Sequence, residues 1–479
     1  MVRKFATFLG ITALLSSVFA LVPSLSASSL VAAPSVNWHQ ATTGPKPGGP
    51  GGSMAYDPAT HQLILLEGNT NSTWSWSGTS WTHLDSAGCN AQDMGCTNGP
   101  YENTMELVFD PQSQQLVMFG GQGNQTWAWN GTSWRQVADA GDAGCTSSCT
   151  NSPVTTLGSQ MAYDPVTKQM VMFGGQNYGG TQLNYTWVLS YSNGAYSWSQ
   201  VDDSSDAGCT TACTSSPPAR NVGQMTWDPA TNQLVLWGGE VTAGNADGTN
   251  ATWLWTGTIW QQVDDANGAQ AGCGATLPTP NPCPLSPPGR VGFGMAFDPA
   301  IGEVIVFGGM NHYGASEYND TWAWNGSYWH QIDNAGNAAC GNIVGGTACA
   351  GSPSARDTIS MALDPATNQI VMNGGGGQND TWTAAAVPAV PSMPRHVKVI
   401  FDGDRATVRW NIPAFDGGGP LTGYRATVTH QIKTCAPSKV DWCNEAATIV
   451  LGQRYTIRVW ALNAYGKSPV ATLSGTRNS

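Results

Sequence analysis

Residue types that commonly carry catalysis are present in this chain, but not in the spacings that catalysis requires. The seven histidines show no metal-binding spacing such as His-x-x-x-His, and neither a Gly-x-Ser-x-Gly motif nor a phosphate loop occurs. Asp-rich segments such as Asp202–Asp206 offer oxygen ligands of the kind that calcium prefers, but no twelve-residue loop carries the required Gly and closing Glu. Turn capping by Asp is the alternative role. We therefore expect no metal and no cofactor, and we favour a protein without catalytic activity.

The twelve cysteines form six pairs that are close in the sequence. An even number of close pairs predicts disulfide bonds formed in an oxidising compartment. Zinc is the alternative, but it needs four ligands, and no His or second Cys pair recurs beside these. The predicted pairs are Cys89 with Cys96, Cys145 with Cys149, Cys209 with Cys213, Cys273 with Cys283, Cys340 with Cys349, and Cys435 with Cys443.

Aromatic and arginine side chains that lie in or beside long loops are the candidate ligand contacts. Aromatic rings offer stacking surfaces, and the guanidinium group binds anions through its planar fork of donors. The alternative roles are loop packing for the rings, and ion pairs or hydrogen bonds to loop carbonyls for the arginines. The candidates are Tyr178, Tyr185, Arg220, Arg290, His312, Tyr313, Tyr318 and Arg356.

A sequence unit that recurs six times positions these residues. Its clearest copy, Met295–Ile332, reads as a short apolar strand, an Asp-Pro turn, an apolar run ended by Gly-Gly, an alternating Thr-Trp strand, an Asn-Gly turn and a last strand with Trp. Repeats of four strands predict a β-propeller. The Asp-Pro steps begin at Asp57, Asp110, Asp164, Asp228, Asp298 and Asp364, and the Thr-Trp steps end at Trp74, Trp127, Trp187, Trp253, Trp322 and Trp382.

The sixth copy lacks a fourth strand, because an Ala/Pro-rich segment follows Trp382. The sequence Val36–Gln40 matches Tyr328–Gln331, which belongs to the fourth strand of the fifth copy. We therefore expect the N-terminal segment to complete the last blade. Such closure removes the exposed sheet edge that an open array would leave.

The repeats resemble Kelch repeats. The shared features are the Gly-Gly doublet, an aromatic residue on the third strand, Trp on the fourth strand, and the Pro-x-x-Arg segments that end at Arg220, Arg290 and Arg356. The resemblance covers about residues 36–384 and implies an all-β fold, with a six-bladed Kelch-type propeller over residues 34–384. It also implies that arginines at the entrance of the central channel contact an anion or an acidic peptide. One fold hosts many functions, so the ligand is not implied.

Loop length varies on one face of this predicted propeller. The loops Gln176–Tyr185, Glu240–Asn250 and Met310–Asn319 of blades three to five are long, and they share a face with the cysteine-bearing loops between blades. Binding residues concentrate on variable loops that a rigid scaffold carries. We therefore predict the binding site on this face, towards blades three to five, whereas the repeated Trp residues are expected to pack between blades.

The C-terminal part reads as a second domain. Residues 385–394 form an Ala/Pro linker, and residues 395–479 resemble a fibronectin type III domain, with Trp410 as its core Trp and Tyr455 at its tyrosine corner. Galactose oxidase also joins a Kelch propeller to a sandwich domain. The histidines here provide no set that fits its copper site, and every Cys has a near partner, so its activity is not expected.

The N-terminal residues predict export. Residues 1–33 read as a signal peptide, with Arg3 and Lys4 before the apolar stretch Phe5–Val22. An uncleaved membrane anchor is the alternative. The net charge of −12 argues against nucleic-acid binding, which needs clustered Lys and Arg.

Together these features predict a secreted or cell-surface-associated monomer that binds an extracellular polysaccharide, cell-wall glycan or protein. It has no membrane contact after signal cleavage. The alternative is an extracellular carbohydrate-active enzyme, resembling a glycoside hydrolase, with the second domain as a spacer.

The cysteine pairing is directly testable. We expect six local disulfides and no free thiol, because each cysteine has one close partner in the sequence. Thiol titration of the denatured, unreduced protein should therefore read near zero. A bridge between cysteines of different pairs, found by peptide mapping, would contradict this pairing.

Overall fold

The computed structural model describes parts of the chain between Ser35 and Arg477. The described ranges are 35–41, 44–48, 52–68, 72–86, 106–120, 125–137, 153–154, 156–177, 179–201, 216–241, 249–263, 286–311, 317–332, 352–387, 390–391, 393–402, 405–411, 413, 421–428, 431–435, 442–448, 452–468 and 470–477.

The predicted signal peptide and five of the six predicted cysteine pairs lie outside the described residues. Their cleavage and their bonding therefore stay predictions, which the thiol titration and peptide mapping above would test for the cysteines. The five pairs are Cys89 and Cys96, Cys145 and Cys149, Cys209 and Cys213, Cys273 and Cys283, and Cys340 and Cys349.

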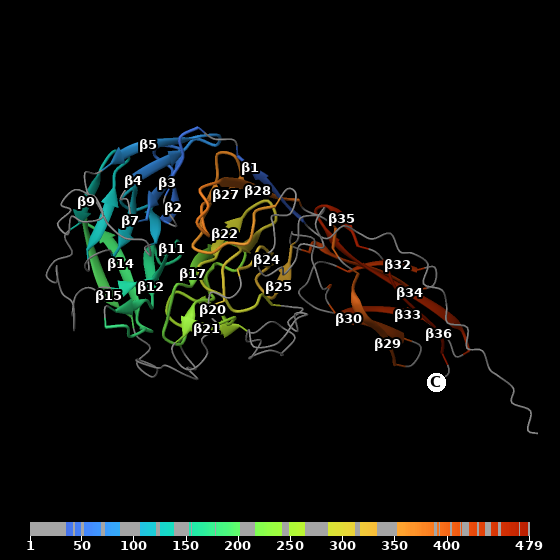
Figure 1. Cartoon of the computed structure of the whole chain (residues 1–479). Coiled ribbons are helices and arrows are strands. Elements are labelled where there is room, and N and C mark those ends of the chain that lie inside the picture. The colour runs from blue at the N-terminus through green and yellow to red at the C-terminus, as the bar shows by residue number, and fades with distance from the viewer. Residues whose placement is uncertain are drawn as a thin grey trace, which may run out of the picture.

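Six antiparallel sheets of four strands each make up the larger part of the described chain, which is all-β and propeller-like (Figure 1). Sheet 1 contains β2 (Gly52–Asp57), β3 (Gln62–Glu67), β4 (Ser72–Trp76) and β5 (Trp81–Ser86). Sheet 2 contains β6 (Leu107–Asp110), β7 (Gln115–Phe119), β8 (Thr126–Trp129) and β9 (Trp134–Val137). Sheet 3 contains β11 (Gln160–Asp164), β12 (Gln169–Phe173), β14 (Thr186–Ser192) and β15 (Ala195–Gln200).

The remaining three sheets repeat this order. Sheet 4 contains β17 (Gln224–Asp228), β18 (Gln233–Trp237), β20 (Thr252–Trp255) and β21 (Trp260–Val263). Sheet 5 contains β22 (Gly294–Asp298), β23 (Glu303–Phe307), β24 (Thr321–Trp324) and β25 (Trp329–Gln331). Sheet 6 contains β26 (Ser360–Asp364), β27 (Gln369–Asn373), β28 (Thr381–Val387) and β1 (Ser35–Gln40).

The Asp-Pro steps form the turns between the first two strands of each sheet, as the sequence predicts. In the turn of sheet 1, Asp57 accepts hydrogen bonds from the backbone N–H of Ala59 at 2.9 Å and from the Thr60 hydroxyl at 3.0 Å. His61 then takes a left-handed φ of 57°, and the residue at this position does so in all six turns. The buried carboxylate therefore replaces water as the acceptor for the turn, which explains why Asp recurs there.

Neighbouring sheets are joined by one hydrogen bond that recurs six times. The indole N–H of a fourth-strand Trp donates to the hydroxyl of the Thr in the Thr-Trp step of the preceding sheet, at 2.8–3.4 Å. Sheet 1 is joined to sheet 6 in this way, so the six sheets form a closed ring. The pairs are Trp81 with Thr381, Trp134 with Thr73, Trp198 with Thr126, Trp260 with Thr186, Trp329 with Thr252, and Trp38 with Thr321.

The N-terminal strand β1 supplies the fourth strand of sheet 6. It pairs antiparallel with β28 from Ser35 opposite Val387 to Gln40 opposite Trp382, which confirms the predicted pairing of this segment. Trp38 is 3% exposed, and its ring lies 4.9 Å from that of Phe307 in sheet 5. The hydrophobic cores lie between neighbouring sheets, because each cluster combines residues of two of them.

The C-terminal residues form two smaller antiparallel sheets that share one core. Trp410 and Tyr424 are buried in it, with their ring centroids 5.2 Å apart. The Tyr465 hydroxyl donates to the backbone oxygen of Ala300 in the ring at 3.2 Å. One sheet contains β29 (Arg395–Asp402), β30 (Arg405–Asn411) and β33 (Trp442–Thr448), and the other contains β31 (Gly423–Val428), β32 (Gln431–Cys435), β34 (Arg454–Asn463), β35 (Gly466–Lys467) and β36 (Ala471–Thr476).

Cys435 lies in β32 and Cys443 in β33, which lie side by side across these two sheets. The disulfide between them stays a prediction. In the described part of the chain, no helix is present that could cross a membrane.

Closure by β1 makes Trp38 a stability determinant. We expect Trp38→Ala to lower the free energy of unfolding by about 3–5 kcal/mol, because it leaves a cavity between sheets 5 and 6. Trp38→Phe should cost about 1 kcal/mol, because it mainly loses the hydrogen bond to Thr321. Denaturant titration of the ring's Trp fluorescence would measure both.

The matched control is Ile259→Ala, at a 53%-exposed position on a turn, which should change stability by less than about 0.5 kcal/mol. A mature protein that lacks the residues before position 45, and so lacks β1, should be destabilised more than any of these substitutions destabilise it. Unchanged melting of the truncated protein would rule out closure by β1.

Candidate functional site

The three predicted arginines are fully buried, at 0–1% exposure. Each donates through Nη1 to the backbone oxygen of the first glycine in the Gly-Gly doublet of its own sheet, at 2.9–3.1 Å. Both glycines of each doublet have positive φ, and this conformation presents the carbonyl to the arginine. The Pro-x-x-Arg segments therefore fasten the start of each first strand to the end of the second.

Two of these arginines also form ion pairs inside their sheets. Arg290 is bonded to both carboxylate oxygens of Asp320, at 2.5 and 3.0 Å, and Arg356 is bonded to Asp380 in the same way, at 2.5 and 3.2 Å. Burial would raise the pKa of Asp380, but hydrogen bonds from Arg356 and Trp382 outweigh it and hold this pKa below its usual value. This corrects the prediction that Arg290 and Arg356 contact a ligand, because their donors already have partners within the protein.

The predicted aromatic contacts divide into two groups. Tyr185 packs against the core cluster between sheets 2 and 3, and the Tyr318 ring lies 4.0 Å from the guanidinium carbon of Arg290. Loop packing, the alternative role, therefore describes both residues. Tyr178, His312 and Tyr313 lie outside the described residues, so their role stays a prediction.

Parts of the long loops of sheets 3 to 5 are ordered by short ladders. β10 (Thr156–Leu157) pairs with β13 (Gln176–Asn177), β16 (Arg220–Asn221) pairs with β19 (Glu240–Val241), and Val291 forms a bridge to Met310. Each ladder joins the segment before a first strand to the loop after the second strand. The loop face therefore has a defined backbone around the entrance of the ring.

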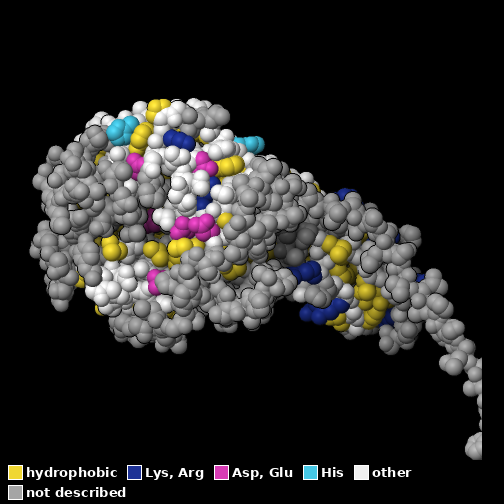
Figure 2. Space-filling view, viewed as in Figure 1, with side chains coloured by type: hydrophobic (Ala, Val, Ile, Leu, Met, Phe, Trp, Pro, Cys, Tyr) yellow, Lys and Arg dark blue, Asp and Glu magenta, His cyan; other side chains and the backbone are white. Residues whose placement is uncertain are grey.

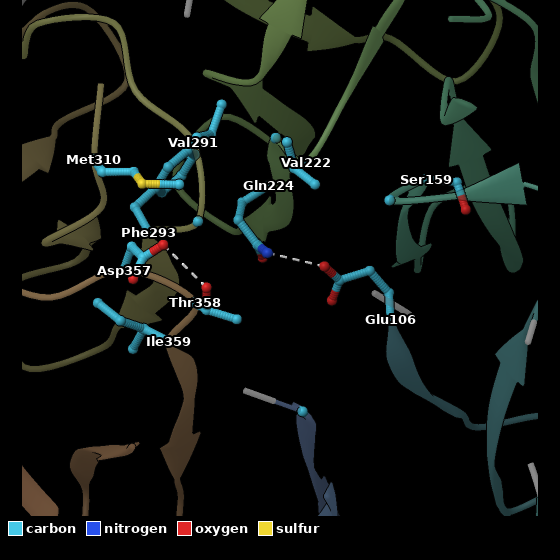
Figure 3. Close-up of a pocket in the computed structure, with 14 residues that line it drawn as sticks. Glu106, Ser159, Val222, Gln224, Val291, Phe293, Met310, Asp357, Thr358 and Ile359 are labelled. Atoms are coloured by element: carbon cyan, nitrogen blue, oxygen red, sulfur yellow. Dashed lines mark hydrogen bonds between the residues drawn. The ribbon is translucent and has the colours of Figure 1, made fainter. Parts of the chain in front are cut away.

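A pocket of about 180 Å³ occupies this entrance (Figure 3). Residues at or just before the first strands of all six sheets line it, together with Met310. Glu106 of sheet 2 and Gln224 of sheet 4 point toward each other, and the Gln224 amide donates to the Glu106 carboxyl at 2.9 Å. On the other side of the pocket, Asp357 accepts a hydrogen bond from Thr358 at 3.2 Å. We call this pocket the channel mouth.

Glu106 has an unusual ionisation. Burial raises its pKa from 4.5 to about 8, and the hydrogen bond from Gln224 opposes this only in part. Its carboxyl group is therefore largely protonated at neutral pH. A carboxyl with a strongly raised pKa in a cleft is a recognised mark of a functional site. No local sequence pattern marks Glu106, because its partner Gln224 is 118 residues away.

Beyond Glu106 and Gln224 lies a larger cavity of about 440 Å³, which we call the inner channel. One bulky apolar side chain from each first strand lines it, and all six are partly exposed. Each directly precedes the Asp of an Asp-Pro turn, so the repeat itself marks this position. These residues are Tyr56, Phe109, Tyr163, Trp227, Phe297 and Leu363.

Charge is distributed unevenly between the two parts of the chain. Residues 34–394 contain 26 Asp and Glu but only 6 Lys and Arg, whereas residues 395–479 contain 11 Lys and Arg and 5 Asp and Glu. Figure 2 shows basic side chains on the C-terminal part, while the acidic side chains visible on this face lie on the ring. Since Arg220, Arg290 and Arg356 are buried, few basic groups of the ring face solvent.

The raised pKa of Glu106 predicts a pH-dependent stability. Between about pH 4.5 and 8 the folded state keeps a proton that the unfolded state has lost, so the stability associated with this group falls as pH rises through that window. Glu106→Gln cannot ionise at this position. We therefore expect its free energy of unfolding to rise relative to that of the wild type by up to about 1.4 kcal/mol per pH unit across the window. Melting curves of both proteins from pH 4 to 9 measure the difference. Parallel pH profiles would show that Glu106 titrates normally.

Comparisons with known proteins give only partial matches. No family model matches the chain. Fast-type myosin-binding protein C of Gallus gallus is 33% identical over 98 residues, which cover 19% of this chain and only 9% of that protein. Among solved structures, YjhT matches with 12% identity and a TM-score of 0.43, covering 76% of this chain and 99% of that one. The Clostridium perfringens spore cortex lytic enzyme SleM matches with 19% identity and a TM-score of 0.17, covering 22% of this chain and 35% of that one.

Proposed function

We propose that this chain is a secreted, non-catalytic binding protein whose ligand is an extracellular polysaccharide or cell-wall glycan. The observation that carries the proposal is the inner channel, where partly exposed aromatic side chains from five of the six sheets surround one cavity. A concave, mostly apolar site with a few convergent polar groups is the usual form of a ligand site. Glu106, Gln224 and Asp357 supply those polar groups at the channel mouth.

We further propose that the ring is a six-bladed Kelch-type propeller closed by its N-terminal strand, followed by a fibronectin type III domain. The six indole-to-threonine hydrogen bonds and the pairing of β1 with β28 support the first assignment. The division of the C-terminal strands into one sheet of β29, β30 and β33 and another around β31 and β34, with buried Trp410, supports the second.

The aromatic side chains of the inner channel favour a sugar chain as the ligand. Tyr and Trp present an apolar face together with a polar edge, which suits a sugar ring with its C–H face and hydroxyl rim. The excess of acidic residues in the ring disfavours a polyanionic chain, because like charges repel at the entrance. We therefore expect a neutral glycan to bind better than an acidic one.

One observation favours the enzyme alternative. Two carboxyl groups, those of Glu106 and Asp357, line the channel mouth, and glycoside hydrolysis uses a pair of carboxyl groups. The raised pKa of Glu106 keeps it protonated at neutral pH, which is the state of a general acid. Release of reducing ends from a bound glycan, abolished by Glu106→Gln, would identify the protein as an enzyme.

Substitution in the inner channel tests the binding proposal. After a screen of the purified protein against neutral and acidic polysaccharides, we expect Trp227→Ala and Phe297→Ala to weaken binding of the best glycan at least about tenfold. The reason is loss of stacking area in the cavity, and affinity gel electrophoresis beside thermal melts measures it.

The matched control is Val166→Ala, at a 64%-exposed position on an Asp-Pro turn beside the channel. It should bind as the wild type does. If both channel variants keep their melting temperature and full affinity, the ligand does not occupy the inner channel. Retention of a secreted protein rather than a glycan in the screen would point to the protein-binding form of the function.

A further inference from the structure

Sheets 5 and 6 each contain a three-residue cluster beside their Gly-Gly doublet, which is buried in sheet 5 and partly exposed at Asp380 in sheet 6. In sheet 5, Asp320 accepts from Arg290 through both oxygens, and its Oδ2 also accepts from the Trp322 indole N–H at 2.7 Å. In sheet 6, Asp380 accepts from Arg356 and, at 2.7 Å, from the Trp382 indole N–H. One carboxylate therefore satisfies both a guanidinium and an indole, two donors that would be costly to bury alone.

Sheet 4 contains the same two donors but not the carboxylate. Arg220 stands where Arg290 and Arg356 stand, and its Nη1 donates to the Gly238 oxygen at 3.1 Å. Trp253 is the counterpart of Trp322 and Trp382, in the same strand register: Trp253 is opposite Leu236 as Trp322 is opposite Val306. The residue before its Thr-Trp step is Ala251, where sheets 5 and 6 have Asp.

The missing carboxylate leaves one buried nitrogen of each residue without an acceptor. Within the described part of the chain, neither Nη2 of Arg220 nor Nε1 of Trp253 has a hydrogen-bond acceptor, although both atoms are buried. Arg220 is 0% exposed and Trp253 is 1% exposed. A buried charge without a partner destabilises the folded state strongly, so a guanidinium in this position favours a counter-ion from another source.

We propose that sheet 4 binds a small monovalent anion beside Ala251, held by Nη2 of Arg220 and Nε1 of Trp253. The anion takes the place that the Asp320 and Asp380 carboxylates take in their sheets. The side chain of Asp exceeds that of Ala by one carboxylate group, which sets the ligand size at that of chloride or formate. Ala251 is only partly buried, so the position lies nearer the surface than Arg220 does.

This site is separate from the channel. It lies beside the Gly238-Gly239 doublet and the third strand of sheet 4, whereas the channel residues of that sheet belong to its first strand. Its function is to complete the packing of sheet 4 with an exchangeable counter-ion. Stability of the ring then depends on the anion in solution, independently of any glycan in the channel.

The test compares the wild-type chain with Ala251→Asp, which supplies the carboxylate covalently. In low-salt buffer we expect the variant to melt about 2 °C or more above the wild type. Added chloride or formate at constant ionic strength, set with a bulky anion such as gluconate, should raise the wild-type melting temperature in a saturable way. The variant should lose that response. Equal responses in both proteins would overturn the proposal.

A reciprocal variant keeps the test independent of one substitution. Asp320→Ala converts the sheet 5 cluster into the arrangement of sheet 4, and it should gain a second chloride-dependent or formate-dependent rise in melting temperature. If this variant does not fold, Ala251→Asp still decides the matter. Competition between chloride and formate for the rise in melting temperature distinguishes these two anions. Bromide soaked into crystals should give an anomalous signal beside Ala251.

A carboxylate of the chain itself is the competing source. Asp247 belongs to the loop 242–248, which lies outside the described residues. If Asp247→Asn removes stability from the wild type but not from Ala251→Asp, and the wild type shows no anion response, then Asp247 is the counter-ion and the proposal fails.

Discussion

The hydrogen bond from a fourth-strand indole to the threonine hydroxyl of the preceding sheet is the constraint on which the ring depends. It pairs a buried indole N–H with a buried threonine hydroxyl, and leaving either group unpaired would cost about 1–3 kcal/mol. Each bond also sets the spacing and rotation between two sheets, and the Trp rings fill the space between them. The bond recurs at every junction, including that between sheets 6 and 1. Because the ring is closed, a change in spacing or rotation between two sheets must be compensated at the other junctions.

The same constraint creates the channel. Sheets held apart by indole-sized packing cannot bring their first strands together at the centre, so side chains alone must fill it. The repeat places one bulky apolar residue per sheet there, yet these residues remain partly exposed around a cavity of about 440 Å³. Glu106 and Gln224 form a hydrogen bond at the boundary between this cavity and the channel mouth. The candidate site is thus a consequence of how the ring is spaced rather than of any one loop.

Much of the ring could be predicted from the sequence because its determinants are local and periodic. The Asp-Pro turn, the Gly-Gly doublet and the Thr-Trp step each act over a few residues, and six copies make the pattern plain; even the pairing of β1 followed from the similarity of Trp38 and Trp329. The site could not be predicted in this way. Whether Arg290 faces solvent depends on Asp320, 30 residues later, and the raised pKa of Glu106 depends on burial by other sheets. The inner-channel residues recur at one position of the repeat. Repetition alone does not tell whether these side chains pack against one another or stay partly exposed around a cavity.

Pairing of Ser35 with Val387 brings the entry and the exit of the ring to adjacent positions on one sheet edge. The ring contains some 350 residues, yet the chain enters it and leaves it at neighbouring positions. Such a unit is suited to insertion into a surface loop of another protein, since an insert tolerates a host best when its two ends lie close together. Both faces of the ring and its channel would stay accessible in such a chimera, because the attachment points lie at the edge of sheet 6 that is farthest from its first strand.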